Sequence, residues 1–389
     1  GFSGCCIGIQ VGPNLSYDIK FYGIIGDCPA LKLILNFIGH TGYYCCFLCY
    51  IRGTHIMNKR QYFFQQPLML RGTTSYLEES RKAERNRTNE FGHLGTNILE
   101  EILDVPLPQA IIIDYLHVTL LRHTKAIVTE LYALLKPAER QRLDISLKQQ
   151  RFPHFFNRKM RAIKDLSYVK ATELRNMLLY GLLPNFYLFL SLETIAHFAL
   201  YVCGIRLLHG KRVFDTKTSM MADQLLCRYY EDHEHYYTGL QNLVLHLHSH
   251  YSPQYDDHGA FCNRGTFGQE DLIGHISSNR HGTRYYGELI TYYYSIDFSL
   301  HNKTERKIAP NGLTDETNQN ADTYGDLDRY HQQICGCNTI NKCIAVYRRC
   351  VIRDHMYHSL LYNKRQTSVS YFVQYCVNND NKQHRFWDN

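Results

Sequence analysis

The segment Ile24-Ile25-Gly26-Asp27-Cys28-Pro29-Ala30 decides how the first part of the chain folds. The run from residue 19 to residue 26 is rich in β-branched and aromatic residues, which predicts a buried strand. Pro29 suits the first turn of a helix, which we expect over residues 30–38. Asp27 would then stand at the carboxyl end of the strand, where open α/β sheets place their ligands. A carboxylate there is a candidate ligand for a hard divalent cation such as Mg²⁺.

Length and composition indicate an ordinary globular protein. The chain has 389 residues, which at roughly 150 per domain suggests two or three structural units. Apolar residues make up 44% and charged residues 20%, which excludes disordered and collagen-like classes. The net charge of +7 permits a nucleic-acid partner without requiring one. A chain of this size needs no disulfides, so its 14 cysteines favour a reduced, intracellular setting.

One long apolar stretch raises the question of a membrane span. Residues 187–208 are long enough to cross a bilayer, but Glu193, His197 and Arg206 lie inside the stretch. Charged groups at that depth are costly, so we expect a buried core helix and no membrane partner.

The pattern along the chain predicts five regions. Apolar residues recur at three- and four-residue spacing from about residue 96 to residue 250, which predicts an all-α block between two parts of a core. Asn, Thr and Asp enrichment marks a linker, and alternating polar and apolar residues follow it. The expected regions are a partial core with the Cys-x-x-Cys segment at 1–95, the all-α insertion at 96–250, a return to the core at 251–300, a linker at 301–330 and a small β-rich C-terminal module at 331–389.

Two pairs of metal-ligating residues are candidates for one zinc site. Cys46 and Cys49 have the two-residue gap of a zinc half-site, although a redox pair or two buried thiols would show the same spacing. His246 and His250 are four residues apart, so a helix would present both on one face. A polar surface is the plainer explanation for two histidines alone. Together the four residues would complete a Cys₂His₂ zinc site.

Two further motifs contain acidic residues. Asp114 and His117 follow a buried isoleucine run and would share one face of a helical turn. A metal or hydrogen-bonding role for them is as plausible as a helix cap with a histidine packed beneath it. Glu270 lies on a helix that starts near Thr266. It is either a second metal carboxylate or an ordinary acid in a helix's first turn.

In this order, the motifs resemble those of the DDE/D transposases, most closely the CACTA-like branch and its transposase domain-containing relatives, over residues 4–284. The resemblance implies an α+β fold class, with a ribonuclease H-like mixed sheet split by a large all-α insertion. It implies that Asp27 and Glu270 are catalytic and bind two Mg²⁺ ions for DNA hydrolysis and strand transfer in DNA transposition and recombination. It also implies double-stranded DNA at transposon ends as the partner and the nucleus as the location, and leaves room for a homo-oligomer.

The sequence departs from that family at its start. The first catalytic Asp belongs on a strand well before Asp27, but only 26 residues precede Asp27, and Asp18 lies just ahead of the same strand. Two carboxylates hold Mg²⁺ poorly. We therefore expect an N-terminally truncated fragment without nuclease activity, cut from an active parent. The alternatives are a domesticated DNA- or protein-binding protein without catalysis, and an unrelated zinc-stabilised helical scaffold.

Basic residues suggest a DNA-contacting surface. A cluster near three phenylalanines would contact phosphates, although a solvated charged face explains such a run more often. Its members are Arg158, Lys159, Arg161 and Lys164. A C-terminal group of Cys335, Cys337 and Cys343 with His331 has irregular spacing, and free thiols are favoured over zinc there.

Overall fold

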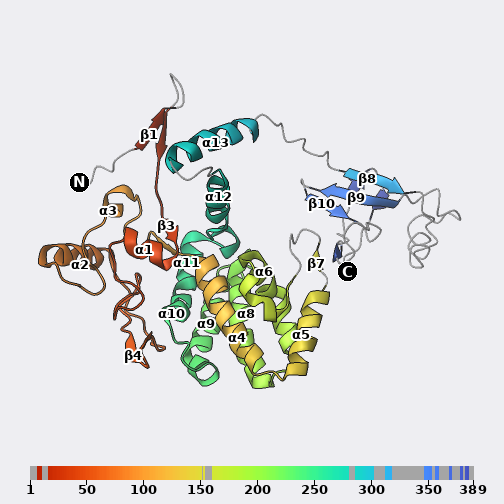
Figure 1. Cartoon of the computed structure of the whole chain (residues 1–389), viewed down its shortest axis with the longest axis horizontal. Helices are drawn as coiled ribbons and strands as arrows, with labels where there is room; N and C mark the ends of the chain where they lie inside the picture. The colour runs from red at the N-terminus through yellow and green to blue at the C-terminus, as the bar shows by residue number, and fades with distance from the viewer. Residues whose placement is uncertain are drawn as a thin grey trace. The chain divides into compact units, whose positions relative to one another are not determined.

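The structure, a computed structural model, describes most of the chain as far as residue 301 and short strands beyond it. The described residues are 7–10, 16–150, 152–153, 160–279, 285–301, 312–317, 346–352, 355–358, 368–369, 377–379 and 382–384. Two compact units make up the chain (Figure 1): residues 1–148 with 160–278, and residues 149–159 with 279–389. The fold class is α+β, mainly helical with small sheets, as the sequence predicted at that level.

Two short parallel strands position the acidic residues of the first unit. Strand β3 (Ile24–Gly26) pairs with β6 (Ile111–Ile113), with Gly26 opposite Ile113. Asp27 and Asp114 therefore follow neighbouring strands at the same edge. The prediction that residues 96–250 are all helical was wrong at β6. Three consecutive β-branched residues form a strand there because β3 offers them a partner, and a run this short carries no periodic signal.

The helix after β3 is shorter than predicted. Helix α1 runs over Cys28–Ile34, where Asp27 caps its start by accepting a hydrogen bond from the Ala30 N–H. Asn36 adopts a left-handed conformation with φ of 49° just beyond the helix. Asn tolerates this conformation, which commonly terminates helices, so the chain turns before residue 38.

A glutamine takes the place of a third strand beside β6. Helix α11 (Tyr251–His258) carries Gln254, whose side chain accepts from the Ile113 N–H at 3.0 Å and donates to the Ile111 carbonyl at 2.7 Å. The free edge of β6 is thereby satisfied without another strand.

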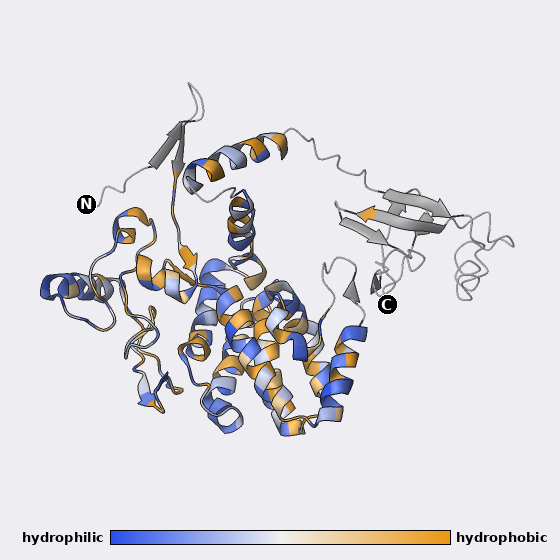
Figure 2. Ribbon diagram, in the orientation of Figure 1, coloured by the Kyte–Doolittle hydropathy of each residue, from blue (hydrophilic) through white to orange (hydrophobic). Residues whose placement is uncertain are grey.

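The remaining small elements of the first unit lie near its N-terminal part. They are the hairpin β1 (Ile7–Gln10) and β2 (Ser16–Ile19), the hairpin β4 (Thr54–Ile56) and β5 (Lys59–Gln61), helix α2 (Thr73–Asn86) and helix α3 (Leu99–Ile102). Helix α2 is largely hydrophilic (Figure 2). Its buried Tyr76 joins Leu31, Leu35, Phe37 and Phe47 in a core cluster that also contacts β6.

The helical block begins directly after Asp114. Its elements are η1 (Leu116–Thr124), α4 (Lys125–Ala133), α5 (Pro137–Gln149), η2 (Ile163–Tyr168), α6 (Ala171–Asn176), η3 (Met177–Gly181), α7 (Leu182–Phe186), α8 (Leu192–His209), α9 (Lys217–Tyr236), α10 (Leu243–Leu247) and η4 (His248–His250), followed by α11, η5 (Phe261–Asn263) and α12 (Phe267–Ser278). Segments η1 and η3 are π-helical.

Helices α8 and α9 pack closely along each other. Gly204 permits this, because a Cβ atom there would lie 2.8 Å from the Leu226 side chain. Ser191 caps α8 by accepting from the Thr194 N–H. The apolar stretch 187–208 thus contributes most of a core helix. Within the described residues, no helix is both long enough and apolar enough to cross a membrane.

The second unit contains helix α13 (Tyr286–His301) and several strands. Strands β10 (His355–His358), β9 (Val346–Ile352) and β8 (Gly312–Thr317) form an antiparallel sheet in that order. Strand β7 (Phe152–Pro153) pairs in parallel with β11 (Ser368–Val369), and β12 (Val377–Asn379) pairs with β13 (Lys382–His384). Strand β8 lies inside the stretch 301–330 that was expected to be a linker. The polar composition of this stretch gives no strand signal, although the segment pairs with β9. His331 and Cys335, Cys337 and Cys343 lie outside the described residues.

Candidate metal centre and the acidic edge beside it

The structure brings Cys46, Cys49, His246 and His250 together, as the sequence predicted. All four are buried, and their ligating atoms lie within 4.8 Å of one another. The Cys46 Sγ lies 3.4 Å from His250 Nε2, the Cys49 Sγ lies 3.2 Å from His246 Nε2, and the two Nε2 atoms are 3.2 Å apart. Tetrahedral zinc with bonds of about 2.0–2.3 Å would separate its ligands by about 3.3–3.8 Å. The four atoms are therefore spaced closely enough to bind zinc.

The local backbone structure directs the cysteine pair and the histidine pair toward each other. The Leu48 N–H points at the Cys46 Sγ from 3.5 Å, a contact that stabilises a thiolate within a tight turn. Asn242 caps α10 by accepting from the Leu245 N–H at 3.0 Å. The tighter turn η4 follows α10 directly, so His246 and His250 both reach the cysteines.

A buried arginine fixes the cysteine loop. The Arg71 Nε donates to the carbonyls of Cys46 and Cys49 at 3.1 and 3.2 Å. Its other nitrogens reach Glu79 at 3.1 Å and the Phe91 carbonyl at 2.6 Å. Sequence reasoning missed Arg71, because nothing in its neighbourhood sets it apart from a surface arginine. In the structure it sets the backbone from which both sulfurs project.

Electrostatics of the cluster favour the metal-binding form of one cysteine and one histidine. Burial raises the pKa of Cys46, but the hydrogen bond with Cys49 and the nearby imidazoles outweigh it and hold the pKa well below its ordinary value. The hydrogen bond with Cys46 raises the pKa of Cys49. Burial also lowers the pKa of His246, which keeps that ring neutral. One thiolate beside a neutral imidazole is a partly prepared ligand set. An imidazole nitrogen lies within 3.4 Å of each sulfur. The four residues therefore suit a metal site better than a dithiol redox pair.

The second group of predicted residues lies at the edge where β3 and β6 end. Asp114 is buried, and its oxygens accept from the backbone N–H groups of Leu116, His117 and Thr266 at 3.0–3.2 Å. The Thr266 hydroxyl donates at 2.9 Å, and His117 Nδ1 lies at 2.5 Å. Burial opposes ionisation, but these hydrogen bonds lower the pKa of Asp114. Asp114 therefore caps η1 and anchors the start of α12, which is the structural alternative raised by its sequence position.

His117 connects the carboxylates of this edge. Its hydrogen bond with Asp114 raises its pKa, and the charges of Asp27 and Glu270 add to the effect. The His117 Nε2 lies 3.7 Å from Glu270 Oε1. We call Asp27, Asp114, His117 and Glu270 the acidic edge. Glu270 lies on the first turn of α12 with its side chain 53% exposed.

The acidic edge is less complete as a metal site than the Cys₂His₂ cluster. Among the described residues, only that cluster brings three or more ligating atoms within 4.8 Å of one another. Asp114 has its oxygens engaged, which leaves Asp27 and Glu270. Mg²⁺ needs several anchored oxygens at close range, so the acidic edge as it stands does not fit the ion.

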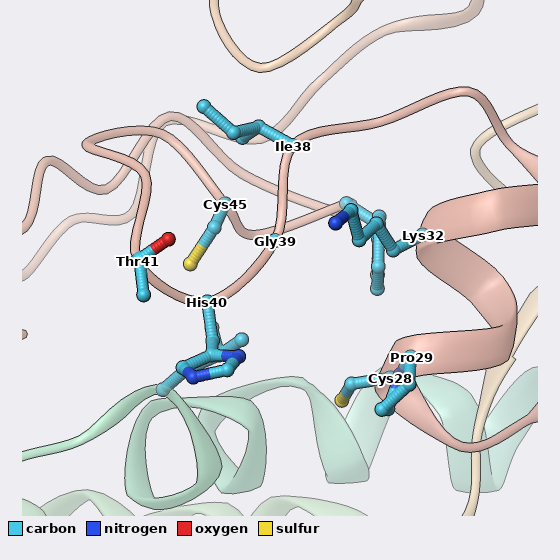
Figure 3. A pocket seen from close by; sticks show the side chains of 10 residues that line it. Cys28, Pro29, Lys32, Ile38, Gly39, His40, Thr41 and Cys45 are labelled. Carbon is cyan, nitrogen blue, oxygen red and sulfur yellow. The ribbon is translucent and has the colours of Figure 1, made fainter.

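A cavity of about 170 Å³ borders both regions (Figure 3). It is lined by Cys28, next to Asp27, and by Cys45, next to Cys46, with Lys32 and His40 also on its walls. Burial raises the pKa of both thiols to about 12. They are thus protonated and poor nucleophiles at neutral pH, which argues against cysteine catalysis in the cavity.

The residues predicted to contact DNA are only partly described. Arg161 lies 3.4 Å from the Glu173 carboxylate and donates to the Tyr168 carbonyl at 2.8 Å, so its charge is partly neutralised. Lys164 is exposed on η2. Arg158 and Lys159 lie outside the described residues.

Comparisons with protein-family models, curated proteins and solved structures found no match to this chain.

Proposed function

We propose that this chain is the zinc-stabilised core of a DDE/D transposase-like protein, whose longer parent hydrolyses and joins DNA phosphodiesters, and that the chain by itself is inactive. One observation carries the proposal: Asp27 and Asp114 follow adjacent parallel strands, and Glu270, more than 240 residues after Asp27, lies within 4 Å of the histidine bound to Asp114. Sites built from distant residues at the carboxyl ends of parallel strands are typical of enzymes with open sheets.

The arrangement also supports a ribonuclease H-like core with a helical insertion. The polypeptide leaves the sheet after Asp114, forms the helical block, and returns at Thr266 to the same carboxylate. The block is therefore inserted between two parts of one site. Thr266 places the first turn of α12, and with it Glu270, beside the strand ends.

The chain's own residues support positioning but not catalysis. Asp27 is held by its cap on Ala30, and His117 is held by Asp114. A third free carboxylate is needed before two Mg²⁺ ions can be anchored, and Asp114 cannot supply it while its oxygens accept the hydrogen bonds described above. We therefore assign the missing ligand to the parent.

The proposal is tested by cleavage of supercoiled DNA with added Mg²⁺. We expect no cleavage by this chain, and metal-dependent cleavage by the longer parent that Asp27→Asn and Glu270→Gln each reduce by at least about 100-fold, the scale of a lost catalytic group. Glu101→Gln, an exposed acid on α3, is the matched control and should leave the rate unchanged.

Two results would count against the proposal. Full activity of the parent with both Asp27→Asn and Glu270→Gln would show that the acidic edge is not catalytic. Cleavage by this chain that Asp27→Asn abolishes would show that its ligand set is already complete.

The second candidate is a domesticated DNA- or protein-binding protein that keeps the fold without catalysis. It is favoured by the engagement of Asp114 in capping and by a complete, buried Cys₂His₂ cluster whose role is structural. Specific DNA binding by a parent that never cleaves DNA would select this candidate. For both candidates we propose that the protein is located in the nucleus and that it self-associates.

A further inference from the structure

A row of basic side chains continues from the acidic edge along η1 and α4. Arg122 lies in η1, Lys125 opens α4, and Lys170 is the cap residue of α6, which packs against η1. No acidic side chain pairs with any of these three in the described part of the chain. Burial and repulsion from Arg122 and Lys170 lower the pKa of Lys125. Three crowded cations without a counter-charge create a local field that attracts anions.

The π-helical form of η1 relates Arg122, the first residue of the row, to His117 of the acidic edge. In an α-helix, five residues turn the chain about 140° past a full turn, so Arg122 would face away from His117. A π-helix bonds residues five apart, so residue 122 lies roughly one turn on from residue 117. The wider turn therefore places Arg122 on the side of the helix that carries His117. An ordinary helix with the same sequence would separate the two.

The groove beside this row suits a phosphate backbone better than exposed bases. Lys125 lines a shallow groove of about 420 Å³ between α4 and η2, together with Ala126, Thr129, Glu130, Leu166 and Ser167. Glu130 is the one acid among these lining residues, and Lys164 is an exposed residue of η2, the element that also carries Leu166 and Ser167. The lining has hydroxyl groups but no aromatic ring. Single-strand binding sites rely on aromatic stacking, whereas duplexes are held through phosphates.

We propose that Arg122, Lys125, Lys164 and Lys170 form a surface that binds the phosphate backbone of duplex DNA and leads it to the acidic edge. The inference rests on the proposed function for its choice of DNA as the polyanion. It shares Lys164 with the basic cluster predicted from the sequence and adds Arg122, Lys125 and Lys170, whereas Arg161 of that cluster is already paired with Glu173.

The test measures the binding of a labelled DNA duplex by fluorescence anisotropy at several salt concentrations, without added divalent metal. The combined variant Arg122→Gln with Lys125→Gln should weaken binding about tenfold and make the slope of log affinity against log salt shallower by about 2, at roughly 0.9 per lost phosphate contact. The matched control is Lys211→Gln with Lys217→Gln, which removes the same charge from exposed positions before and at the start of α9. It should leave the slope unchanged.

Further variants and competitors define the outcomes. Arg122→Lys with Lys125→Arg keeps both charges and should bind like the wild type, which separates lost charge from misfolding. Wild-type affinity in the glutamine pair, or equal weakening in the control pair, would overturn the inference. So would displacement of the duplex by polyglutamate or by single-stranded DNA at equal charge. Because no metal is added, binding is scored apart from catalysis. An inactive parent that binds through this groove would reject only the proposed function.

Discussion

At the scale of single residues, Arg71 has the widest influence on the metal centre. Its guanidinium is fully buried, stacks over Tyr50 at 4.4 Å, and links the Cys46–Cys49 loop to Glu79 on α2. No motif contains it. A buried charge with all its partners in place is a strong constraint on the surrounding backbone, because removal of one member leaves the others unsatisfied.

Substitution of Arg71 should therefore be strongly destabilising. We expect Arg71→Met to lower the free energy of unfolding by about 3 kcal/mol, because three carbonyls lose a donor and Glu79 loses its ion-pair partner. Arg71→Lys keeps the charge but not the forked geometry, and should fall between wild type and Arg71→Met. Arg81→Met, an exposed arginine on α2, is the control and should change stability by less than about 0.5 kcal/mol. Urea unfolding of the three variants checks this, and a small loss in Arg71→Met would refute the assignment.

At the scale of elements, the helical block encloses histidines that form no ion pair with an acid in the described part of the chain. His123 of η1 lies with its ring centre 4.8 Å from that of His248 and 5.6 Å from that of His233, and His197 lies 6.4 Å from His233. All four are buried, and both ring nitrogens of His233 lack a partner among the described residues. Burial in this packing favours the neutral form of each ring.

This packing makes the block sensitive to acid. Burial lowers the pKa of His233 to about 3 and of His197 and His248 to about 4, and holds that of His123 well below its ordinary value. In the unfolded chain these four histidines bind protons below about pH 6.5, whereas in the folded chain they remain neutral at that pH. Stability is therefore complete above that pH and falls by about 1.4 kcal/mol per pH unit for each histidine as the pH drops toward the folded pKa values.

Urea unfolding between about pH 7.5 and pH 5 measures the effect. His233→Phe removes one titrating group and should make the loss of stability with falling pH less steep. His235→Phe, at an exposed position on the same helix, should leave the steepness unchanged. Equal pH dependence in wild type and His233→Phe would show that His233 is protonated in the folded state.

At the scale of the whole molecule, the metal centre joins segments about 200 residues apart. Cys46 and Cys49 come from the loop before β4, and His246 and His250 come from α10 and η4 at the end of the helical block. Zinc there would fix the N-terminal part of the first unit to the block. Metal binding in such a site contributes directly to folding.

Loss of one ligand should thus lower zinc content and thermal stability together. We expect Cys46→Ser to bind less zinc than wild type and to melt at a lower temperature, measured by elemental analysis and calorimetry. Cys203→Ser removes an exposed thiol and should change neither property. Zinc content that stays at the wild-type level in Cys46→Ser would remove the site from this account.

Part of this organisation could be predicted from local sequence alone. The spacing of Cys46 and Cys49, and of His246 and His250, marks ligand pairs because each pair is formed within one turn of chain. Asp27 at a strand end and the core helix at residues 187–208 are also local features. Strand β6 and the pairing of β8 depend on a distant partner strand, and no short window of sequence contains that partner.

The sequence by itself singled out the candidate residues: two ligand pairs, two acids near strand or helix ends, and an Asp-x-x-His turn. Only the tertiary structure decided how those residues are used. It committed Asp114 to capping, brought His117 within 3.7 Å of Glu270, buried Arg71 beside the cysteine loop, and wound η1 as a π-helix. The physical reason is that hydrogen-bond saturation, burial and helix winding depend on what surrounds a side chain, and some of those surroundings are far away in the sequence, as Thr266 is from Asp114 and Glu270 from His117.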